Sequence, residues 1–275
     1  MAAKIATPRQ QKHLAVLIDA DNASAAIVES LFEEIAKYGI ASVKRIYGDW
    51  TGPQLGGWKK VLLEHSIQPM QQFAYTTGKN ATDSSLIIDA MDLLYTRRFD
   101  GFCLVSSDSD FTRLAARLRE EGLEVIGFGE QKTPKPFVSA CDKFIYTELL
   151  RNDAEPAELE STGNGASATA PAPASTAESK PSTPQTTTKV KPQKVPVDFI
   201  VKVIDDNSDE DGWCLLAVLG SNISKLRSDF DSRMYGFRKL SDLIKAQNGR
   251  FELQVLGTTP TGGQALAVRN RKPSK

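Results

Sequence analysis

The chain of 275 residues has few of the side chains that build disulfide frameworks and zinc sites. It contains two histidines and three cysteines, and Cys103, Cys141 and Cys214 lie far apart with no CxxC pair among them. An odd number of widely spaced cysteines argues against a disulfide framework or a zinc site and is typical of a reducing cytosol. We therefore expect three buried thiols and a cytoplasmic protein.

Long apolar runs and an excess of charge are also lacking. No stretch approaches the roughly 20 apolar residues of a membrane-spanning helix, and residues 1–13 are polar and basic, unlike a secretory signal. Basic and acidic residues both number 34, so the formal net charge is zero. A site for nucleic acid must therefore come from local clusters of charge.

Composition divides the chain into two domains. Residues 152–196 are mostly Ala, Thr, Ser, Pro, Lys and Glu, and such a segment cannot offset the entropy cost of ordering by burying apolar surface. We predict a flexible N-terminus at 1–12, a first domain at 13–151 and a disordered linker at 152–196. A second domain is expected at 197–257, followed by a hairpin strand and a basic tail at 258–275.

Strand and helix signals alternate in the first domain. The run of apolar residues from Leu14 to Ile18 is typical of a buried parallel strand. Further strands are expected at 42–47, 67–73, 102–105 and 123–128 with an edge strand near 144–146, and helices at 22–38, 55–65, 82–97 and 111–121. This alternation predicts an α/β fold with a doubly wound, mainly parallel sheet.

The second domain has a different pattern. Helices are expected at 198–206, 213–220 and 240–247, with another beginning within 225–230. Two short alternating strands at 250–255 and 264–268 follow these helices. Helices followed by a β-hairpin predict a small winged-helix domain.

Carboxylates follow two of the expected strands and open one of the helices. Asp19 and Asp21 end the first strand, Asp108 and Asp110 end the fourth, and Asp83 opens the helix after the third. Open α/β sheets bind ligands at the carboxyl ends of their strands, so these groups should meet. Carboxylates brought together repel each other, and Mg²⁺ or Mn²⁺ would remove the repulsion. Such an ion can activate water and neutralise charge at a phosphodiester.

Each of these residues also has a simpler structural interpretation. Asp21 or Asn22 would serve as the cap of the first helix, and Asp108 or Ser109 as the cap of the helix near residue 111. Asp83 would stabilise the start of its own helix through the helix dipole. Three acidic segments at one edge are harder to explain as caps, which favours the metal site.

Three segments carry a family resemblance. Residues 17–22 (LIDADN), 79–89 and 104–111 (LVSSDSDF) resemble the signatures of the NYN domain, a branch of the PIN-like nucleases, and the similarity extends over about 13–150. The resemblance implies that the metal-binding and catalytic carboxylates are Asp19, Asp83, Asp108 and Asp110.

The same resemblance bears on neighbouring residues. It implies that Asn22 orders the first loop or the substrate, and it makes Asp89 a weaker metal candidate. Ser107 stands where many members have glycine. Lys79, just before the Asp83 helix, is a candidate contact for a substrate phosphate, with a solvated loop lysine as the alternative.

The second domain resembles the OST-HTH or LOTUS family, a winged helix associated with RNA metabolism. Its most distinctive part is the stretch from Tyr235 to Leu240 (YGFRKL), and the match covers about 197–257. Tyr235, Arg238 and Lys239 form an aromatic and basic cluster that is a candidate RNA contact. The alternative is that Tyr235 belongs to the core and the two charges to an ordinary surface.

These observations predict a metal-dependent ribonuclease whose appended domain binds RNA or a protein partner. One alternative is a non-catalytic RNA-binding or regulatory adaptor that keeps the fold. A more distant alternative is a phosphatase of the haloacid-dehalogenase type, because Asp19-x-Asp21 after an apolar strand matches its nucleophile and acid. That class also needs Thr or Val where Ala23 stands, and a separate lysine motif.

Overall fold

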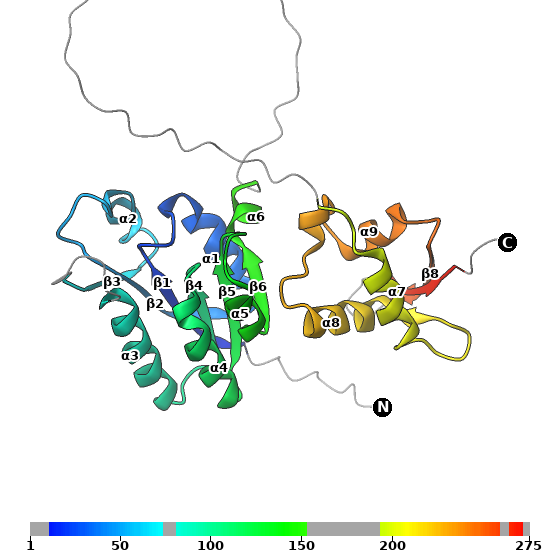
Figure 1. Ribbon diagram of the computed structural model, residues 1–275, viewed down its shortest axis with the longest axis horizontal. Coiled ribbons are helices and arrows are strands. Elements are labelled where there is room, and N and C mark those ends of the chain that lie inside the picture. The colour runs from blue at the N-terminus through cyan, green and yellow to red at the C-terminus, as the bar shows by residue number, and fades with distance from the viewer. Residues whose placement is uncertain (1–10, 74–80, 153–192, 259–263, 272–275) are drawn as a thin grey trace, which may run out of the picture.

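The computed structural model describes residues 11–73, 81–152, 193–258 and 264–271, which form two domains (Figure 1). Most of the predicted linker lies outside the described residues, as do Lys79 and most of the predicted flexible N-terminus. Residues 193–196, placed in the linker by composition, contact the second domain, because Gln193 N donates to the carbonyl of Met234.

The first domain is built on a six-stranded sheet in which all neighbouring strands are parallel. Its strands are β1 (His13–Asp19), β2 (Ile40–Gly48), β3 (Gln68–Gln71), β4 (Gly101–Val105), β5 (Glu124–Gly129) and β6 (Lys143–Tyr146). The spatial order is β3-β2-β1-β4-β5-β6, so the winding direction reverses between β1 and β4. In such sheets, the crevice at the carboxyl ends of the two strands flanking the reversal is where ligands bind.

Helices cover both faces of this sheet because both faces are apolar. In β1, Leu14, Val16 and Ile18 pack on one side, and Ala15 and Leu17 on the other. The first face carries α1 (Val28–Ala36), α2 (Gly56–Val61) and α6 (Thr147–Asn152); the second carries α3 (Ala81–Tyr95), α4 (Thr112–Glu120) and α5 (Lys135–Ala140). The predicted doubly wound α/β fold is confirmed, and its mainly parallel sheet is parallel throughout.

The start of the first helical segment differs from the expectation. A short 3-10 helix, Ala25–Ile27, precedes α1, and Ser24 caps it by accepting a hydrogen bond from Ala26 N. Neither Asp21 nor Asn22 is therefore the cap of this helix. Both residues remain in the loop after β1, where their polar groups are available for other contacts.

The second domain combines three helices with a small antiparallel sheet. Its elements are α7 (Val197–Asp205), β7 (Cys214–Leu215), α8 (Leu216–Leu226), a 3-10 helix (Ser232–Tyr235), α9 (Leu240–Ala246), β8 (Phe251–Thr258) and β9 (Gln264–Asn270). The strand order is β7-β9-β8, and the β8–β9 hairpin is the wing. The predicted small winged-helix domain is confirmed.

Two expectations for the helices of this domain were wrong in detail. Cys214 and Leu215, expected in a helix, pair instead with β9, and α8 begins only at Leu216. No helix starts within 225–230, because α8 ends at Leu226 and the chain then runs as a turn and an extended segment.

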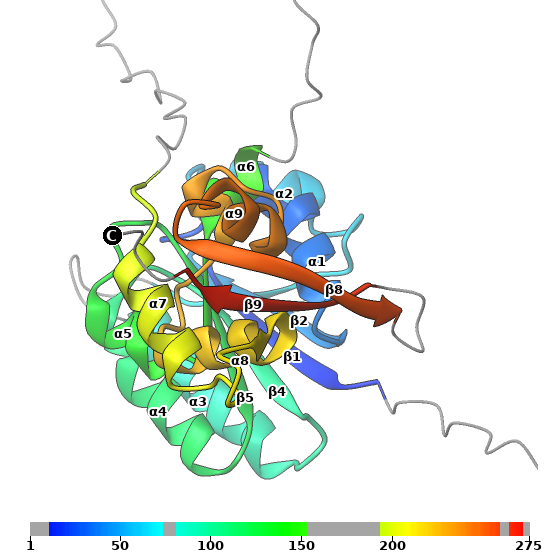
Figure 2. The ribbon, with the colours of Figure 1, turned by 90° about the vertical axis from the view of Figure 1, so that its right-hand side faces the viewer.

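The segment that follows α8, from Arg227 to Asp231, joins the two domains. Phe144 N in β6 donates to the Ser228 carbonyl at 2.9 Å, and Tyr146 OH donates to the Asp229 carboxylate at 3.1 Å. The second domain therefore lies against the β6 edge of the sheet (Figures 1 and 2). Within the described ranges, no helix is long and apolar enough to cross a membrane.

Candidate metal centre

The acidic residues that the sequence singled out gather at the winding reversal of the sheet. Asp19 is the last residue of β1, Asp83 lies in the first turn of α3, and Asp108 and Asp110 follow β4. One carboxylate oxygen from each of Asp83, Asp108 and Asp110 lies within 4.8 Å of the other two. Three carboxylates from two separate segments therefore converge on one point.

The electrostatics of Asp83 reflect this crowding. Burial, followed by the negative charges of Asp19, Asp108, Asp110 and Asp21, raises the pKa of Asp83 from 3.8 to about 6. Partial burial disfavours the charged carboxylate, and each neighbouring anion disfavours it further. All of these causes raise the pKa of Asp83, so burial and like charge dominate around this carboxyl.

Asp19 is buried and its charge acts on Asp83, but it is not one of the three residues whose oxygens lie within 4.8 Å of one another. Its side chain is fully buried and accepts hydrogen bonds from Asp21 N at 3.0 Å, Asn22 Nδ2 at 2.7 Å and Ser106 Oγ at 2.8 Å. Burial raises the pKa of Asp19 even though these bonds favour its charged form. The three donors fix the orientation of the carboxylate and tie the loop after β1 to the end of β4.

Asp108 acts as a helix cap and still belongs to the cluster. Its Oδ1 accepts a hydrogen bond from Asp110 N at 2.9 Å at the start of the 3-10 helix Ser109–Phe111. One of the two Asp108 oxygens also lies within 4.8 Å of the carboxylate oxygens of Asp83 and Asp110. The capping interpretation and the ligand interpretation are therefore compatible at this residue.

Two serines that the sequence interpretation gave no role hold the loop after β4. Ser106 Oγ accepts from Asp108 N at 3.1 Å, and Ser107 Oγ accepts from Glu130 N at 2.8 Å. A Cβ on Gly129 would meet the Ser106 carbonyl at 2.5 Å, so glycine allows β5 to approach this loop closely. In the sequence, their one distinguishing feature was their position directly after the apolar run of β4.

Asp21 and Asp89 occupy different environments from the cluster. Asp21 is exposed and accepts a hydrogen bond from Thr82 Oγ1 at 3.1 Å, which links the loop after β1 to the start of α3. Asp89 accepts from Arg45 and from the Tyr47 hydroxyl, both at 2.8 Å. Asp89 is thus committed to a structural ion pair and does not join the acids.

The donor set suits a hard divalent cation. All its ligand atoms are carboxylate oxygens, which Mg²⁺ and Mn²⁺ prefer. Opposite ligands of an octahedral Mg²⁺ lie about 4.2 Å apart, because each bond is about 2.1 Å long. The three oxygens lie no more than 4.8 Å from one another, so they are near enough to hold one ion together.

The three candidate RNA contacts in the second domain differ in their exposure to solvent. Tyr235 is only 8% exposed, and its ring centroid lies 5.4 Å from that of Phe230. Of the two interpretations of Tyr235, its burial and its packing on Phe230 favour the core residue over the RNA contact. Arg238 and Lys239 are exposed and remain candidates.

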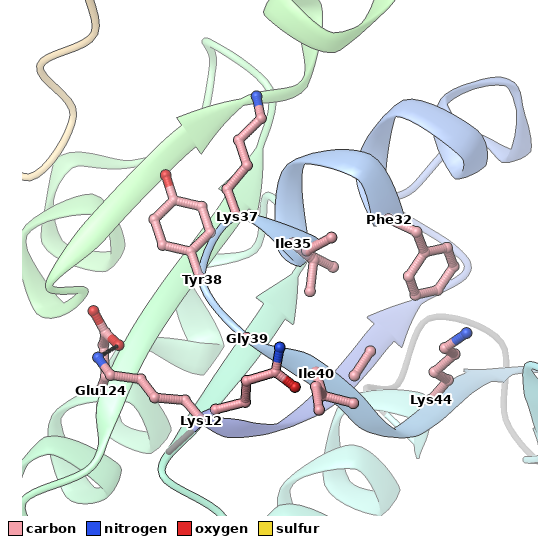
Figure 3. Close-up of a pocket in the computed structure, with 12 residues that line it drawn as sticks. Lys12, Phe32, Ile35, Lys37, Tyr38, Gly39, Ile40, Lys44 and Glu124 are labelled. Carbon is pink, nitrogen blue, oxygen red and sulfur yellow. Dashed lines mark hydrogen bonds and ion pairs between the residues drawn. The ribbon is translucent and has the colours of Figure 1, made fainter. Parts of the chain in front are cut away.

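A hollow of about 920 Å³ lies at the opposite edge of the sheet, near the amino ends of β1 and β2 (Figure 3). Its cations have partners there. Lys12 pairs with Glu124 at 2.6 Å, and the ammonium of Lys44 lies 4.6 Å from the centre of the Phe32 ring. This hollow includes none of the clustered acids, so it is separate from the candidate metal centre.

The NYN domain family matches residues 13–150, the span that carries the acidic cluster. The chain belongs to the NYN family. NYN domains are a PIN-like nuclease family, in keeping with the parallel sheet and the acids at its carboxyl edge. The OST-HTH/LOTUS domain matches residues 190–261, and such domains are associated with RNA binding.

Two solved structures that are similar to this chain are of proteins described as of unknown function or uncharacterized. A protein of unknown function from Vibrio parahaemolyticus is 19% identical, with a TM-score of 0.42; the match covers 50% of this chain and 94% of that chain. An uncharacterized protein from Nitrosomonas europaea is 33% identical, with a TM-score of 0.28, and the match covers 36% and 92%. No curated protein matches the chain.

Proposed function

We propose that this NYN protein is a metal-dependent ribonuclease that hydrolyses RNA phosphodiester bonds, with Asp19, Asp83, Asp108 and Asp110 as its metal centre. The observation that carries the proposal is the convergence of Asp83, Asp108 and Asp110, together with the raised pKa of Asp83. A cation bound among these like charges would offset their repulsion, at the edge of an α/β sheet where ligands bind.

Each carboxylate has a distinct part in this proposal. Asp83, Asp108 and Asp110 hold Mg²⁺ or Mn²⁺ through the oxygens that face one another. Asp19 adds negative charge from below and, through its three hydrogen bonds, fixes the loop that faces the substrate. When bound, the cation would supply Lewis-acid stabilisation of the anionic phosphodiester and lower the pKa of water.

The surroundings of the centre provide candidate substrate contacts. Asn22 lies at the edge of the cluster on an exposed loop, and its amide is already oriented by Asp19. Lys79 lies two residues before α3, outside the described residues, where the sequence favours a phosphate contact. Arg238 and Lys239 would hold RNA on the OST-HTH domain.

The environment of Asp19 disfavours the phosphatase alternative. In that class the first aspartate is the nucleophile and needs access to a phosphoryl group. Here the Asp19 carboxylate is fully buried, and three donors occupy its oxygens. An adaptor without catalytic activity would share the acidic cluster, so only a measurement of turnover separates it from a nuclease.

The test is to supply Mn²⁺ to the full-length protein and to measure hydrolysis of a labelled single-stranded RNA and of p-nitrophenyl phosphate. We expect cleavage of the RNA, its abolition by a chelator, and no release of nitrophenol. RNA binding without cleavage would favour the adaptor, and hydrolysis of the small ester alone would favour the phosphatase.

A further inference from the structure

The turn and extended segment from Arg227 to Asp231 attach the OST-HTH domain to the edge of the NYN sheet. Besides the backbone bond from Phe144 N to Ser228 O, the Ser228 hydroxyl donates to the Val138 carbonyl at 2.7 Å. The Lys143 ammonium donates to the Phe230 carbonyl at 2.9 Å. These contacts use β6 and α5 on one side and a single short segment on the other.

A partly buried ion pair adds specificity to this contact. Arg233 Nη1 donates to Glu34 Oε2 at 2.9 Å, and Arg233 also pairs with Asp231 within its own domain. The Glu34 side chain is 5% exposed and the Arg233 side chain 19%. Separating the domains would leave Glu34 with only Lys37, so the pair favours one docked arrangement.

Docking creates a cleft of about 510 Å³ between the domains. One wall comes from α4 and α5 of the NYN domain, and the other from the end of α8 and the segment after it. Each wall contributes two cations, which are Arg119 and Lys135 on the first and Lys225 and Arg227 on the second. Two acids also line the cleft, so its charge is positive.

The acids of the cleft already have structural partners. Asp142 pairs with Arg119 at 2.8 Å and accepts a hydrogen bond from Val125 N, and Asp229 accepts one from Tyr146. By contrast, Lys135 and Lys225 are exposed, and their ammonium groups make no hydrogen bond or ion pair with the described residues. Two free ammonium groups, one on each wall, thus face the same space.

The cleft also leads toward the acidic centre. Lys135 is the first residue of α5, and the loop before it begins at Glu130, whose N–H donates to Ser107 beside Asp108. A polyanion lying along the cleft could therefore continue over this loop to the carboxyl edge of the sheet.

We propose that the interdomain cleft binds the phosphates of a single RNA strand, with Lys135 and Lys225 as its main contacts, and that it forms only when the domains are docked. This rests on the proposed function only in taking RNA as the ligand. A single strand is favoured over a duplex because the contacts come from two facing walls and not from one open surface.

The test measures binding of fluorescein-labelled oligouridylate to the full-length protein in chelator, where no cleavage occurs. In Lys135→Ala with Lys225→Ala, the slope of log affinity against log salt should fall by about 1.4, because each single-strand phosphate contact contributes about 0.7. Between about 200 and 50 mM salt, the wild type should then gain about sevenfold more affinity than the variant. The matched control, Arg98→Ala with Lys202→Ala, also removes one exposed cation from each domain, and its slope should stay closer to the wild-type slope.

A second variant tests the role of docking. Arg233→Glu places a carboxylate beside Glu34 and should lower the affinity at least as far as the lysine variant does. Glu34→Arg with Arg233→Glu restores the pair with reversed polarity and should recover binding, provided that circular dichroism shows both proteins folded. If either protein fails to fold, Tyr146→Phe with Ser228→Ala takes its place. This variant removes two interdomain hydrogen bonds without replacing a charged residue, and it should weaken binding at least twofold.

The proposal would be overturned if the lysine variant kept the wild-type slope of log affinity against log salt. It would also be overturned if the control variant lost as much of that slope as the lysine variant does. Undocking that leaves RNA affinity unchanged would overturn it as well. Because binding is read in chelator, these results stand whether or not the protein cleaves RNA with Mn²⁺.

Discussion

Replacing Asp83 with asparagine should stabilise the metal-free protein at neutral pH. The pKa of Asp83 rises from 3.8 to about 6, which means that the folded state favours the protonated carboxyl. At pH 7 the Asp83 carboxyl is charged, so the unfavourable environment of that charge lowers the free energy of unfolding by its full amount. Two pKa units correspond to an upper limit of about 3 kcal/mol. Because the side chain is partly solvated, screening reduces this to about 1 kcal/mol.

The sign and the pH window follow from the direction of the shift. Between pH 3.8 and about 6 the folded state binds more protons at Asp83 than the unfolded state does, so rising pH lowers stability through this group. The gain from Asp83→Asn should therefore be largest above pH 7 and vanish below about pH 4. For a protein of this size, about 1 kcal/mol corresponds to a rise of roughly 2–4 °C in Tm.

The assay is thermal unfolding in chelator and in Mn²⁺, with Asp92→Asn as the matched control. Asp92 is exposed on the same helix, about 13 Å further along its axis, and is not part of the cluster. Mn²⁺ at about 100 times its Kd should stabilise the wild type and the control by about 2.7 kcal/mol, and Asp83→Asn much less. A lower Tm for Asp83→Asn in chelator, with an undiminished response to Mn²⁺, would refute the reasoning.

Three further outcomes are expected. Ser106→Ala removes a donor to the buried Asp19 carboxylate and should lower the free energy of unfolding by about 1–2 kcal/mol; an unchanged denaturant midpoint would contradict this role. Arg238→Ala with Lys239→Ala should weaken RNA binding and flatten its salt dependence, and unchanged affinity in a filter-binding assay would point to a protein partner for the OST-HTH domain. Limited proteolysis should cut first within residues 153–192, because their composition cannot form a core, and the two fragments should elute together from a sizing column because the domains are docked; separate elution would count against the interface.

The sequence predicted the parallel sheet because the apolar runs of β1 and β4 alternate with amphipathic helices. The acidic residues could be placed for the same reason, since Asp19 ends β1 and Asp108 lies three residues after β4. The order of the strands could not be predicted from the sequence, because the pairing of β1 with β4 depends on packing between distant segments. The role of Ser106 follows from that pairing, so it became apparent only in the structure.

The docking of the two domains could not be predicted from the sequence. The Arg227–Asp231 segment carries charges and short polar residues that are also typical of a helix end, and a helix was wrongly expected there. Its contact with Phe144 and the nearby pair of Arg233 with Glu34 join residues that are far apart in the chain. Tyr235 shows the opposite case, because an aromatic residue beside two basic ones suits both a core and an RNA site, and only its burial decides between them.

The central claim is that the clustered carboxylates support Mn²⁺-dependent cleavage of RNA. The most direct measurement compares the single-turnover cleavage rates of wild type, Asp83→Asn and Asp92→Asn on one labelled RNA, in preparations freed of contaminating nuclease. We predict that Asp83→Asn loses at least about 100-fold in rate, or about 2.7 kcal/mol of transition-state stabilisation, while it remains folded and binds RNA, and that Asp92→Asn cleaves at the wild-type rate. Folded Asp83→Asn protein that cleaves as fast as the wild type would contradict the account.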